Sequence, residues 1–285
     1  MQSIKAALAW GFLLKQMQLL KLLLLLQICR SQDIPITCQK DGDLALTFDG
    51  GPSMHTGQLL RILSKHNVKA SFHLTPGNFD HPVIQAYVKR AASDGHLLGL
   101  YINDGKNAQK EIDRGRAALL KYAGRTLRFV RLPMPLPEPR ILKAIADQGL
   151  TITSFNFDSM DYHAANRTAP EAQGSVFWSF KELFDAIDPP SKGAFISVQR
   201  DIVAASVAAT DQIISYAKKR GYNFVRLDEC IQSAPEEPPN NVNELTPDST
   251  FPNDPKVKPH ANSATIKKLD IAVIFVVALL TLIEM

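Results

Sequence analysis

Short apolar runs typical of buried strands alternate with longer segments of helical periodicity between residues 43 and 230. The runs expected to form strands are 44–49, 69–74, 96–102, 127–132, 150–157, 193–199 and 222–227. The segments expected to form helices are 56–66, 82–94, 106–122, 137–148, 175–187 and 203–220, with glycines after three of them at 95, 149 and 221. This alternation predicts a parallel sheet covered by helices, with too few strands for a regular eight-fold barrel.

The N-terminal segment departs from this alternation. Lys15 and Lys21 precede an almost purely leucine run at 22–28, and polar residues follow from Arg30. A basic segment, an apolar run too short to span a bilayer and a polar break are typical of a secretory signal, which we place at residues 1–31. The alternative is an ordinary buried helix, although the run has no polar face.

The C-terminal region is first polar and then apolar. Residues 232–265 are rich in Pro, Asn, Glu and Ser, so they bury too little apolar surface to offset their ordering entropy, and we expect a disordered stalk. The apolar tail at 271–283 would make a helix of roughly 20 Å, shorter than the roughly 30 Å hydrocarbon core of a bilayer. Small residues, a short spacer and this tail make residues 266–285 resemble a GPI-anchor signal, and the alternative is a membrane-inserted tail. The sequence thus predicts a secreted protein, GPI-anchored at the cell surface or cell wall.

The basic balance of the chain arises from these end segments. The formal net charge is +4, but removing both segments takes Lys+Arg from 32 to 26 and Asp+Glu from 28 to 26. A near-neutral chain gives no argument for nucleic acid or acidic lipid as a partner. The contacts that we expect are with a membrane, through the anchor or tail, and otherwise we expect a monomer.

Two cysteines flank the region that is expected to fold. Cys29 leaves with the signal, which leaves Cys38 and Cys230. An even pair in an exported protein indicates a disulfide that ties the ends of the domain together. Asn166 begins an Asn-Arg-Thr glycosylation sequon, which is consistent with export.

A sharp change of composition ends the first expected strand. The sequence Leu-Thr-Phe-Asp-Gly-Gly-Pro at 46–52 places Asp49 at the carboxyl end of an apolar run, just before a turn. It resembles Thr-Phe-Asp-Asp-Gly-Pro, the first motif of the polysaccharide deacetylases of carbohydrate esterase family four, the NodB-homology proteins, and in particular of fungal chitin deacetylases. The resemblance implies a distorted, incomplete (β/α)7 TIM-like barrel over residues 38–230. It also implies an end-to-end disulfide and gives Asp49 the position of the catalytic base.

The same resemblance implies a metal-dependent reaction, but this chain lacks the ligand residues. In the family a divalent metal such as zinc or cobalt polarises the N-acetyl carbonyl and activates water. An Asp and two His hold the metal, and at these three positions the chain has Gly50, Tyr101 and Gly105. We therefore expect no metal cofactor.

The alternative is a metal site rebuilt from nearby residues. Asn103 and Asp104 lie in the loop that would carry one ligand, and His96 precedes the same expected strand. A useful site needs three protein ligands that converge on one point, and His96 is expected to bond locally instead. The remaining histidines are expected to be surface or packing residues, and they are His55, His66, His73, His81 and His163.

Three further motifs carry the other expected site residues. Arg131, in Arg-Leu-Pro-Met, has the position of the family's Arg that orients the base; the alternative is a surface Arg. The run 158–162 resembles the family's Asp-Ser-x-Asp-Trp, with Asp161 in the position that supports the catalytic acid and with Asp158 and Tyr162 beside a groove. An equally weighted alternative is a capped turn.

The motif at 195–201 shows the most informative substitution. Gln199-Arg200-Asp201 stands where fungal members have a catalytic His before an Asp, and Gln199 is expected to line the groove. Arg200 replaces that His, and an Arg cannot shuttle protons at any relevant pH. It is expected to pair with Asp161, Asp158 or Asp49.

These observations leave three hypotheses. The first is a secreted deacetylase-like protein without hydrolytic competence that keeps a groove for chitin-like or other N-acetylated glycans. The second is an active deacetylase with a rebuilt metal site. The third is a structural cell-wall protein without a ligand. Metal analysis separates the second hypothesis from the others, and glycan-binding measurements separate the first from the third.

Overall fold

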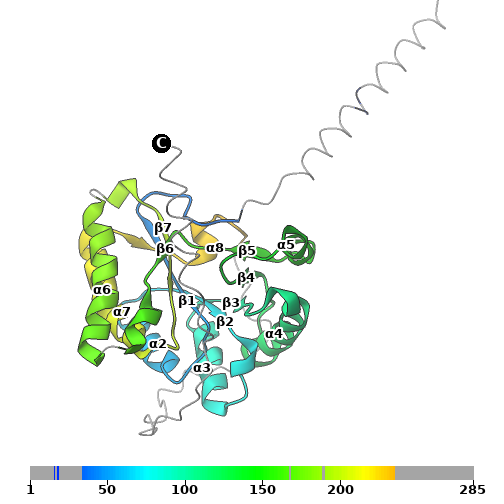
Figure 1. The fold of residues 1–285 in the computed structure, drawn as a ribbon, viewed down its shortest axis with the longest axis horizontal. Helices are drawn as coiled ribbons and strands as arrows, with labels where there is room; N and C mark the ends of the chain where they lie inside the picture. The colour runs from blue at the N-terminus through cyan, green and yellow to red at the C-terminus, as the bar shows by residue number, and fades with distance from the viewer. Residues whose placement is uncertain (1–15, 17, 19–33, 167, 188–189, 235–285) are drawn as a thin grey trace, which may run out of the picture. The chain divides into compact units, whose positions relative to one another are not determined.

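The computed structural model describes residues 16, 18, 34–166, 168–187 and 190–234 (Figure 1). The expected signal at 1–31 falls almost wholly outside these residues, as do the C-terminal tail and all but the first three residues of the stalk. Within the part that is described, no helix is both long enough and apolar enough to cross a membrane.

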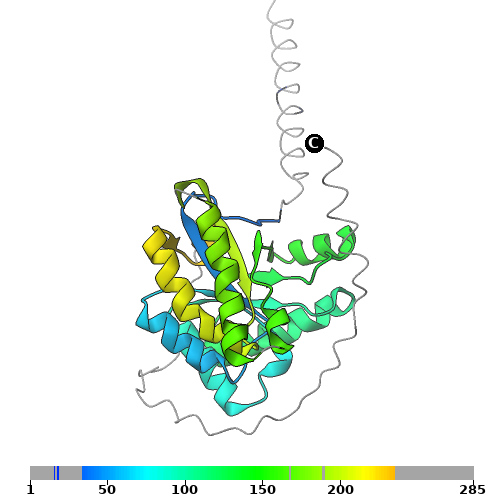
Figure 2. The same cartoon turned by 60° about the vertical axis from the view of Figure 1, so that its left-hand side comes forward.

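A parallel sheet forms the centre of the molecule, with helices on its outer side (Figures 1 and 2). Its strands run in the order β5-β4-β3-β2-β1-β7-β6, and β8 also pairs with β1. Their bounds are β1 (Asp43–Asp49), β2 (Ser71–Leu74), β3 (Leu97–Tyr101), β4 (Phe129–Arg131), β5 (Thr151–Thr153), β6 (Phe157–Asp158), β7 (Phe195–Gln199) and β8 (Asn223–Phe224).

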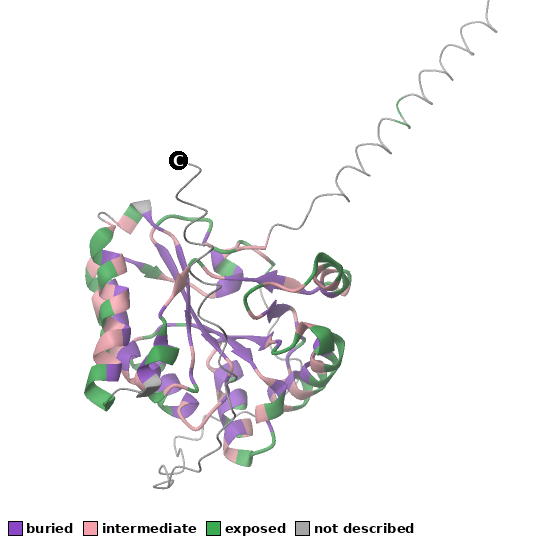
Figure 3. Cartoon of the chain, viewed as in Figure 1, coloured by how far each residue is buried: buried purple, intermediate pink, exposed green. Residues whose placement is uncertain are grey.

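The first strand, β1, lies in the interior of the sheet, between β2 and β7, and both of its faces are covered. All seven residues of β1 are buried (Figure 3), as expected of a parallel strand that packs on two sides. β2 pairs along one edge, with Asp49 opposite His73, and β7 pairs along the other, with Phe48 opposite Gln199. Side chains from three consecutive strands are thereby brought together at one edge of the sheet.

The helices follow the strands as the sequence predicts, with shifted ends. They are α2 (Thr56–Lys65), α3 (Pro82–Ser93), α4 (Ala108–Ala123), α5 (Pro139–Ala146), α6 (Ala169–Ala186), α7 (Ala204–Arg220) and the short α8 (Leu227–Cys230), with single turns at η1 (Pro76–Asn78), η2 (Gly105–Asn107), η3 (Asp161–Asn166) and η4 (Pro190–Lys192). Helix α6 begins six residues before its expected start, because Thr168 and Glu171 form a capping box there.

The fifth expected strand, 150–157, is two strands. Residues 154–156 leave the sheet: the Ser154 carbonyl accepts from Arg131 Nη2 at 2.9 Å, and Asn156 bonds through its side chain to the backbone of Ala194 and Ile196. As a result β5 pairs with β4 while β6 pairs with β7. The sheet path ends at β5 and β6, so the structure confirms an incomplete (β/α) barrel and corrects the expected number of strands.

The amino ends of the strands close over a core that includes the disulfide. Cys38 and Cys230 are bonded, as predicted, with Cα atoms 4.5 Å apart across 192 residues of sequence. Both cysteines are buried with Ala45, Leu97 and Phe129, which lie near the starts of three strands. The polar residues that are described below as a candidate site lie at the opposite edge of the sheet, where the strands end.

Candidate functional site

The carboxyl ends of the strands form one polar edge, which we call the mouth and define by Asp49, Tyr101, Arg131, Asp158 and Arg200. These residues end or follow β1, β3, β4, β6 and β7. Parallel strands that end on one edge place such side chains together, as in other β/α folds. The sequence analysis singled out all five of them.

Asp49 and Arg131 form a buried ion pair at the centre of the mouth. Arg131 Nη1 lies 3.3 Å and 3.4 Å from the two carboxylate oxygens of Asp49 and donates to Thr47 Oγ1 at 2.6 Å. Both charged side chains are almost fully buried. Burial alone would raise the pKa of Asp49, but the Arg131 charge and His73 hold it below its ordinary value. Asp49 is therefore an ionised carboxylate whose orientation Arg131 controls.

His73 was expected to be a surface or packing residue, and it is fully buried beside Asp49. Its Nδ1 lies 2.9 Å from Asp49 Oδ1, and its Nε2 lies 3.3 Å from Thr153 Oγ1. Burial and the nearby Arg131 lower the pKa of His73, so the ring is neutral and donates to Asp49. The signal available in the sequence was its place near the end of an expected strand, 69–74.

Arg200 is held by the two acids of the 158–162 motif. Its Nη1 donates to Asp161 Oδ1 at 2.6 Å and to Asp158 Oδ1 at 3.3 Å, and its backbone N–H donates to Asp161 Oδ2 at 2.6 Å. The guanidinium carbon lies 4.8 Å from the centre of the Tyr162 ring, a cation–π distance. Of the pairings expected for Arg200, the structure thus shows those with Asp161 and Asp158.

The three positions at which the resemblance places metal ligands do not offer a divalent ion a donor set. Gly50 and Gly105 have no side chain, and Tyr101 has a pKa raised by burial and by Asp49, so it remains a neutral phenol. Among the residues that the structure describes, no three His, Cys, Asp or Glu side chains are grouped to hold a metal ion. The fixed charge of Arg200 nearby also opposes a divalent cation. The residues present do not fit the family's metal.

The surroundings of two of these positions suit glycine. Gly50 has φ +84°, where an L side chain is strained. A Cβ on Gly105 would lie 2.9 Å from Pro137 Cβ. Both positions therefore disfavour a ligand side chain.

The residues considered for a rebuilt metal site do not converge. His96 lies immediately before β3, at the end of the strand opposite the mouth, where its Nδ1 accepts from the backbone of Ala70 at 3.1 Å. Burial lowers its pKa to about 3. Asp104 instead accepts from Lys106 N at 2.9 Å and Asn107 Nδ2 at 2.8 Å at the start of η2.

Gln199 corrects another expectation. It was expected to line a groove, but it is fully buried and its Nε2 donates to Ser206 Oγ at 3.0 Å, toward α7. The physical reason is that both faces of β7 are covered and all five of its residues are buried, so Gln199 packs toward α7, whereas Arg200 lies just after the strand. Asn166 ends η3, and its glycosylation remains a prediction.

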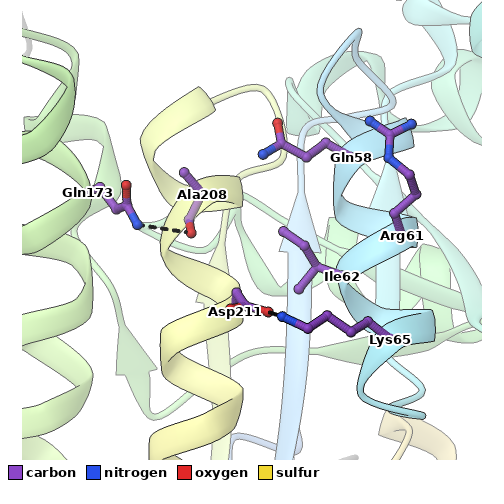
Figure 4. A pocket seen from close by; sticks show the side chains of 7 residues that line it. All are labelled: Gln58, Arg61, Ile62, Lys65, Gln173, Ala208 and Asp211. Carbon is purple, nitrogen blue, oxygen red and sulfur yellow. Dashed lines mark hydrogen bonds and ion pairs between the residues drawn. The ribbon is translucent and has the colours of Figure 1, made fainter. Parts of the chain in front are cut away.

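A separate cleft lies on the helical layer. It has a volume of about 460 Å³ and lies between α2, α6 and α7 (Figure 4). Gln58, Lys65 and Gln173 line it, and Lys65 Nζ bonds Asp211 Oδ1 at 2.7 Å. None of the mouth residues lines this cleft, so the two features are distinct.

Known proteins that are similar to this chain in sequence or in fold include glycan deacetylases. Residues 37–153 match the family model for polysaccharide deacetylase. Over these residues the chain is therefore similar to the polysaccharide deacetylase family.

The most similar relatives include fungal enzymes. The chitin deacetylase of Arthroderma benhamiae is 27% identical over 205 residues, which are 68% of this chain and 53% of that protein. The chitin deacetylase of Colletotrichum lindemuthianum is 27% identical over 215 residues, or 70% of this chain and 84% of that protein. This chain thus spans only about half the length of the first relative.

Solved structures show the same fold. The chitin deacetylase structure from Colletotrichum lindemuthianum matches with a TM-score of 0.66 and 22% identity, over 74% of this chain and 98% of that chain. A carbohydrate esterase family four pseudoenzyme from Bacillus anthracis matches with a TM-score of 0.58 and 15% identity, over 70% of this chain and 69% of that chain.

Proposed function

We propose that this protein binds a chitin-like or other N-acetylated glycan at the mouth without hydrolysing it. The observation that carries the proposal is the Arg200 guanidinium, which is bonded to Asp161 and Asp158 in the position of the family's catalytic His. A guanidinium stays protonated and cannot protonate a leaving amine and then recover its proton at neutral pH. With a donor set that does not fit the metal, the chain lacks the groups for the family reaction.

The side chains around the mouth support a binding role. Met134, Met160, Tyr162 and Ile202 follow β4, β6 and β7, and between 42% and 59% of each is exposed. Exposed apolar side chains that are clustered rather than scattered are typical of an interaction surface. Tyr162 lies against Met160 and the Arg200 guanidinium, and Ile202 lies beside Gly50, so apolar and charged groups stand next to one another for the faces and hydroxyls of a sugar.

The proposal is tested by three measurements on one preparation. Purified protein is expected to hold no stoichiometric zinc or cobalt, to release no acetate from chitin oligomers, and to bind those oligomers in calorimetry. Tyr162→Ala is expected to weaken binding about tenfold, which is a loss of about 1.4 kcal/mol. Trp178→Ala is the matched control, since Trp178 is an exposed aromatic on α6, away from the mouth.

The other two hypotheses correspond to different outcomes of the same measurements. Chelator-sensitive acetate release would establish an active deacetylase and overturn the proposal. Failure to bind any N-acetylated oligomer, in a protein shown to be folded, would leave the structural cell-wall role.

The proposed location is the cell surface, through a GPI anchor. The leucine-rich N-terminal run and the apolar C-terminal tail of the sequence support it. A phosphatidylinositol-specific phospholipase is expected to release the protein from membranes. A surface protein whose intact mass still includes Met285 would favour a membrane-inserted tail instead.

A further inference from the structure

The loop after β1 (50–55) and the loop after β7 (200–203) meet at a buried carboxyl group, that of Asp201. We propose that Asp201 is a positioning residue that clasps these two loops together through its buried carboxyl group and its main chain, and that ionisation of this carboxyl group loosens the clasp and weakens binding at the mouth. The inference rests on the proposed function for its ligand, but the clasp itself follows from the contacts below.

The contacts of Asp201 tie it to three parts of the first loop and its helix. Its Oδ2 accepts from Thr56 Oγ1 at 2.5 Å, and its main-chain carbonyl accepts from Ser53 Oγ at 2.6 Å. Thr56 Oγ1 in turn accepts from Ser53 N at 2.7 Å. The carboxylate also packs on Gly51 so closely that a Cβ there would lie 2.0 Å from Asp201 Oδ1. The two loops are thus joined through one residue, by both its side chain and its main chain.

The surroundings of Asp201 suit a neutral acid better than a carboxylate. The residue is fully buried, and Oδ1 has no hydrogen-bond partner among the described residues. An ionised carboxylate with a single side-chain donor in such a place is costly. Burial raises the pKa of Asp201 to about 7, and the charges of Asp49 and Asp161 add to the effect.

The titratable groups around Asp201 come from several elements. β1 contributes Asp49 and η3 contributes Asp161, and both disfavour a further negative charge. The first loop contributes His55, whose backbone N–H is bonded to Ser53 Oγ at 3.0 Å. Arg200, the neighbour of Asp201 in the chain, is directed at Asp161 instead. The first turn of α7, residues 204–206, carries no titratable side chain.

Loosening this clasp would reach the mouth directly. Asp201 follows Arg200, whose backbone N–H and guanidinium are both bonded to Asp161. An ionised Asp201 is more stable in water than in its buried site, so ionisation favours its movement toward solvent. Such a movement draws Arg200 away from Asp161 and draws the loop 50–55 away from Asp49. The proton on Asp201 is thereby linked to the arrangement of the mouth.

The first test is the pH dependence of binding to a chitin hexamer by the full chain. The unmodified protein is expected to bind about tenfold more weakly at pH 8.5 than at pH 5.5. Asp201→Asn, which cannot ionise, is expected to change less than twofold over the same range. Asp147→Asn, at an exposed acid that caps the C-terminus of α5 and pairs with Lys143, is the matched control and is expected to retain the full pH dependence. An unchanged pH profile in Asp201→Asn would overturn the inference.

A second variant keeps the test informative if Asp201→Asn does not fold. The Thr56 hydroxyl lowers the pKa of Asp201, so Thr56→Val is expected to move the midpoint of the binding profile to higher pH by at least half a unit. A variant that merely loosened the structure would weaken binding without moving the midpoint, and that result would contradict the proposal.

A ligand-free measurement separates this inference from the proposed function. Hydrogen–deuterium exchange in residues 50–55 and 200–203 is compared between the unmodified protein and Asp201→Asn at each pH, so that the intrinsic dependence of exchange on pH cancels. Faster exchange in the unmodified protein at pH 8.5, but not at pH 5.5, is expected. Equal exchange at both values would overturn the clasp. A clasp that responds to pH in a protein that binds no glycan would instead refute the proposed function alone.

Discussion

Three aspartates at or beside the mouth, Asp49, Asp161 and Asp201, differ in pKa because their partners differ. The Arg131 charge and His73 hold the pKa of Asp49 below its ordinary value against the effect of burial. Burial raises the pKa of Asp161 despite its contact with Arg200. Asp201, with only Thr56 as a side-chain donor, has a pKa of about 7. The same residue type thus serves as a fixed charge, a partner for a cation and a group that titrates near neutrality.

Arg131 is the residue whose loss is expected to cost the most stability. Arg131→Met leaves Asp49 charged and buried, which we expect to lower the free energy of unfolding by about 3–5 kcal/mol. Urea denaturation at pH 7 measures the loss. Arg140→Met is the control, because Arg140 is exposed and paired with Glu138 at the surface, and its loss should cost less than about 1 kcal/mol. Adding Asp49→Asn to Arg131→Met should recover part of the loss; a further decrease would show that charge is not the cause.

Asp201 makes stability depend on pH in a direction opposite to that of most acids. Its pKa is about 7 when folded against a model value of 3.8, so its contribution is complete below about pH 4 and is lost as pH rises through about 7. The loss amounts to up to about 4 kcal/mol. Asp201→Asn is expected to reduce this fall, as measured by urea denaturation at pH 5 and pH 8. An equal fall in both proteins would place the titration elsewhere.

The residues of the mouth could be predicted from sequence only where a local motif carries them. Asp49 and Arg131 stand in short motifs that resemble those of the family. His73 has no such motif, because its contact with Asp49 arises from the register of two strands 24 residues apart. The clasp was missed for the same reason: Thr56 and Asp201 are separated by 145 residues, and no local pattern shows that the two loops meet.

At the scale of elements, the periodicity of the sequence predicted the order of strands and helices but not their ends. The run 150–157 is apolar enough for one strand, yet Arg131 and Asn156 divert its middle through side-chain bonds. Helix α6 starts early because of a polar capping box that apolar periodicity does not detect. Element ends depend on such individual polar contacts.

The elements around the lost ligand positions are expected to resist restoration of a metal site. A variant carrying Gly50→Asp, Tyr101→His, Gly105→His and Arg200→His must place an Asp at φ +84° and a His against Pro137. Strain at position 50 costs roughly 1–2 kcal/mol, and overpacking at 105 about 1–3 kcal/mol. We expect this variant to bind zinc weakly in calorimetry and the same variant with Pro137→Gly to bind it at least tenfold more tightly. Equal affinities would show that Pro137 is no obstacle.

At the scale of the whole molecule, the disulfide closes the amino end of the barrel, away from the mouth. Cys38 and Cys230 enclose nearly all of the described residues, and both are buried in the core. Replacing both with Ala is expected to lower the free energy of unfolding by up to about 5 kcal/mol on the chain-entropy model. Thermal unfolding of this variant and of the unmodified protein measures the loss. Because the bond is remote from the mouth, glycan affinity below the unfolding temperature is expected to stay within twofold of the original.

The disulfide also makes the domain a covalent ring. With the Cα atoms of Cys38 and Cys230 4.5 Å apart, a protease that cuts once in an exposed segment, such as the start of α5 at Pro139, opens the ring without dividing the molecule. Nicked protein would migrate as one species until a reducing agent released two fragments. The same proximity allows a short peptide linker to replace the bond, so that new chain ends could be placed at an exposed loop by circular permutation. The permuted protein would have its strands in a different order along the sequence but in the same order within the sheet.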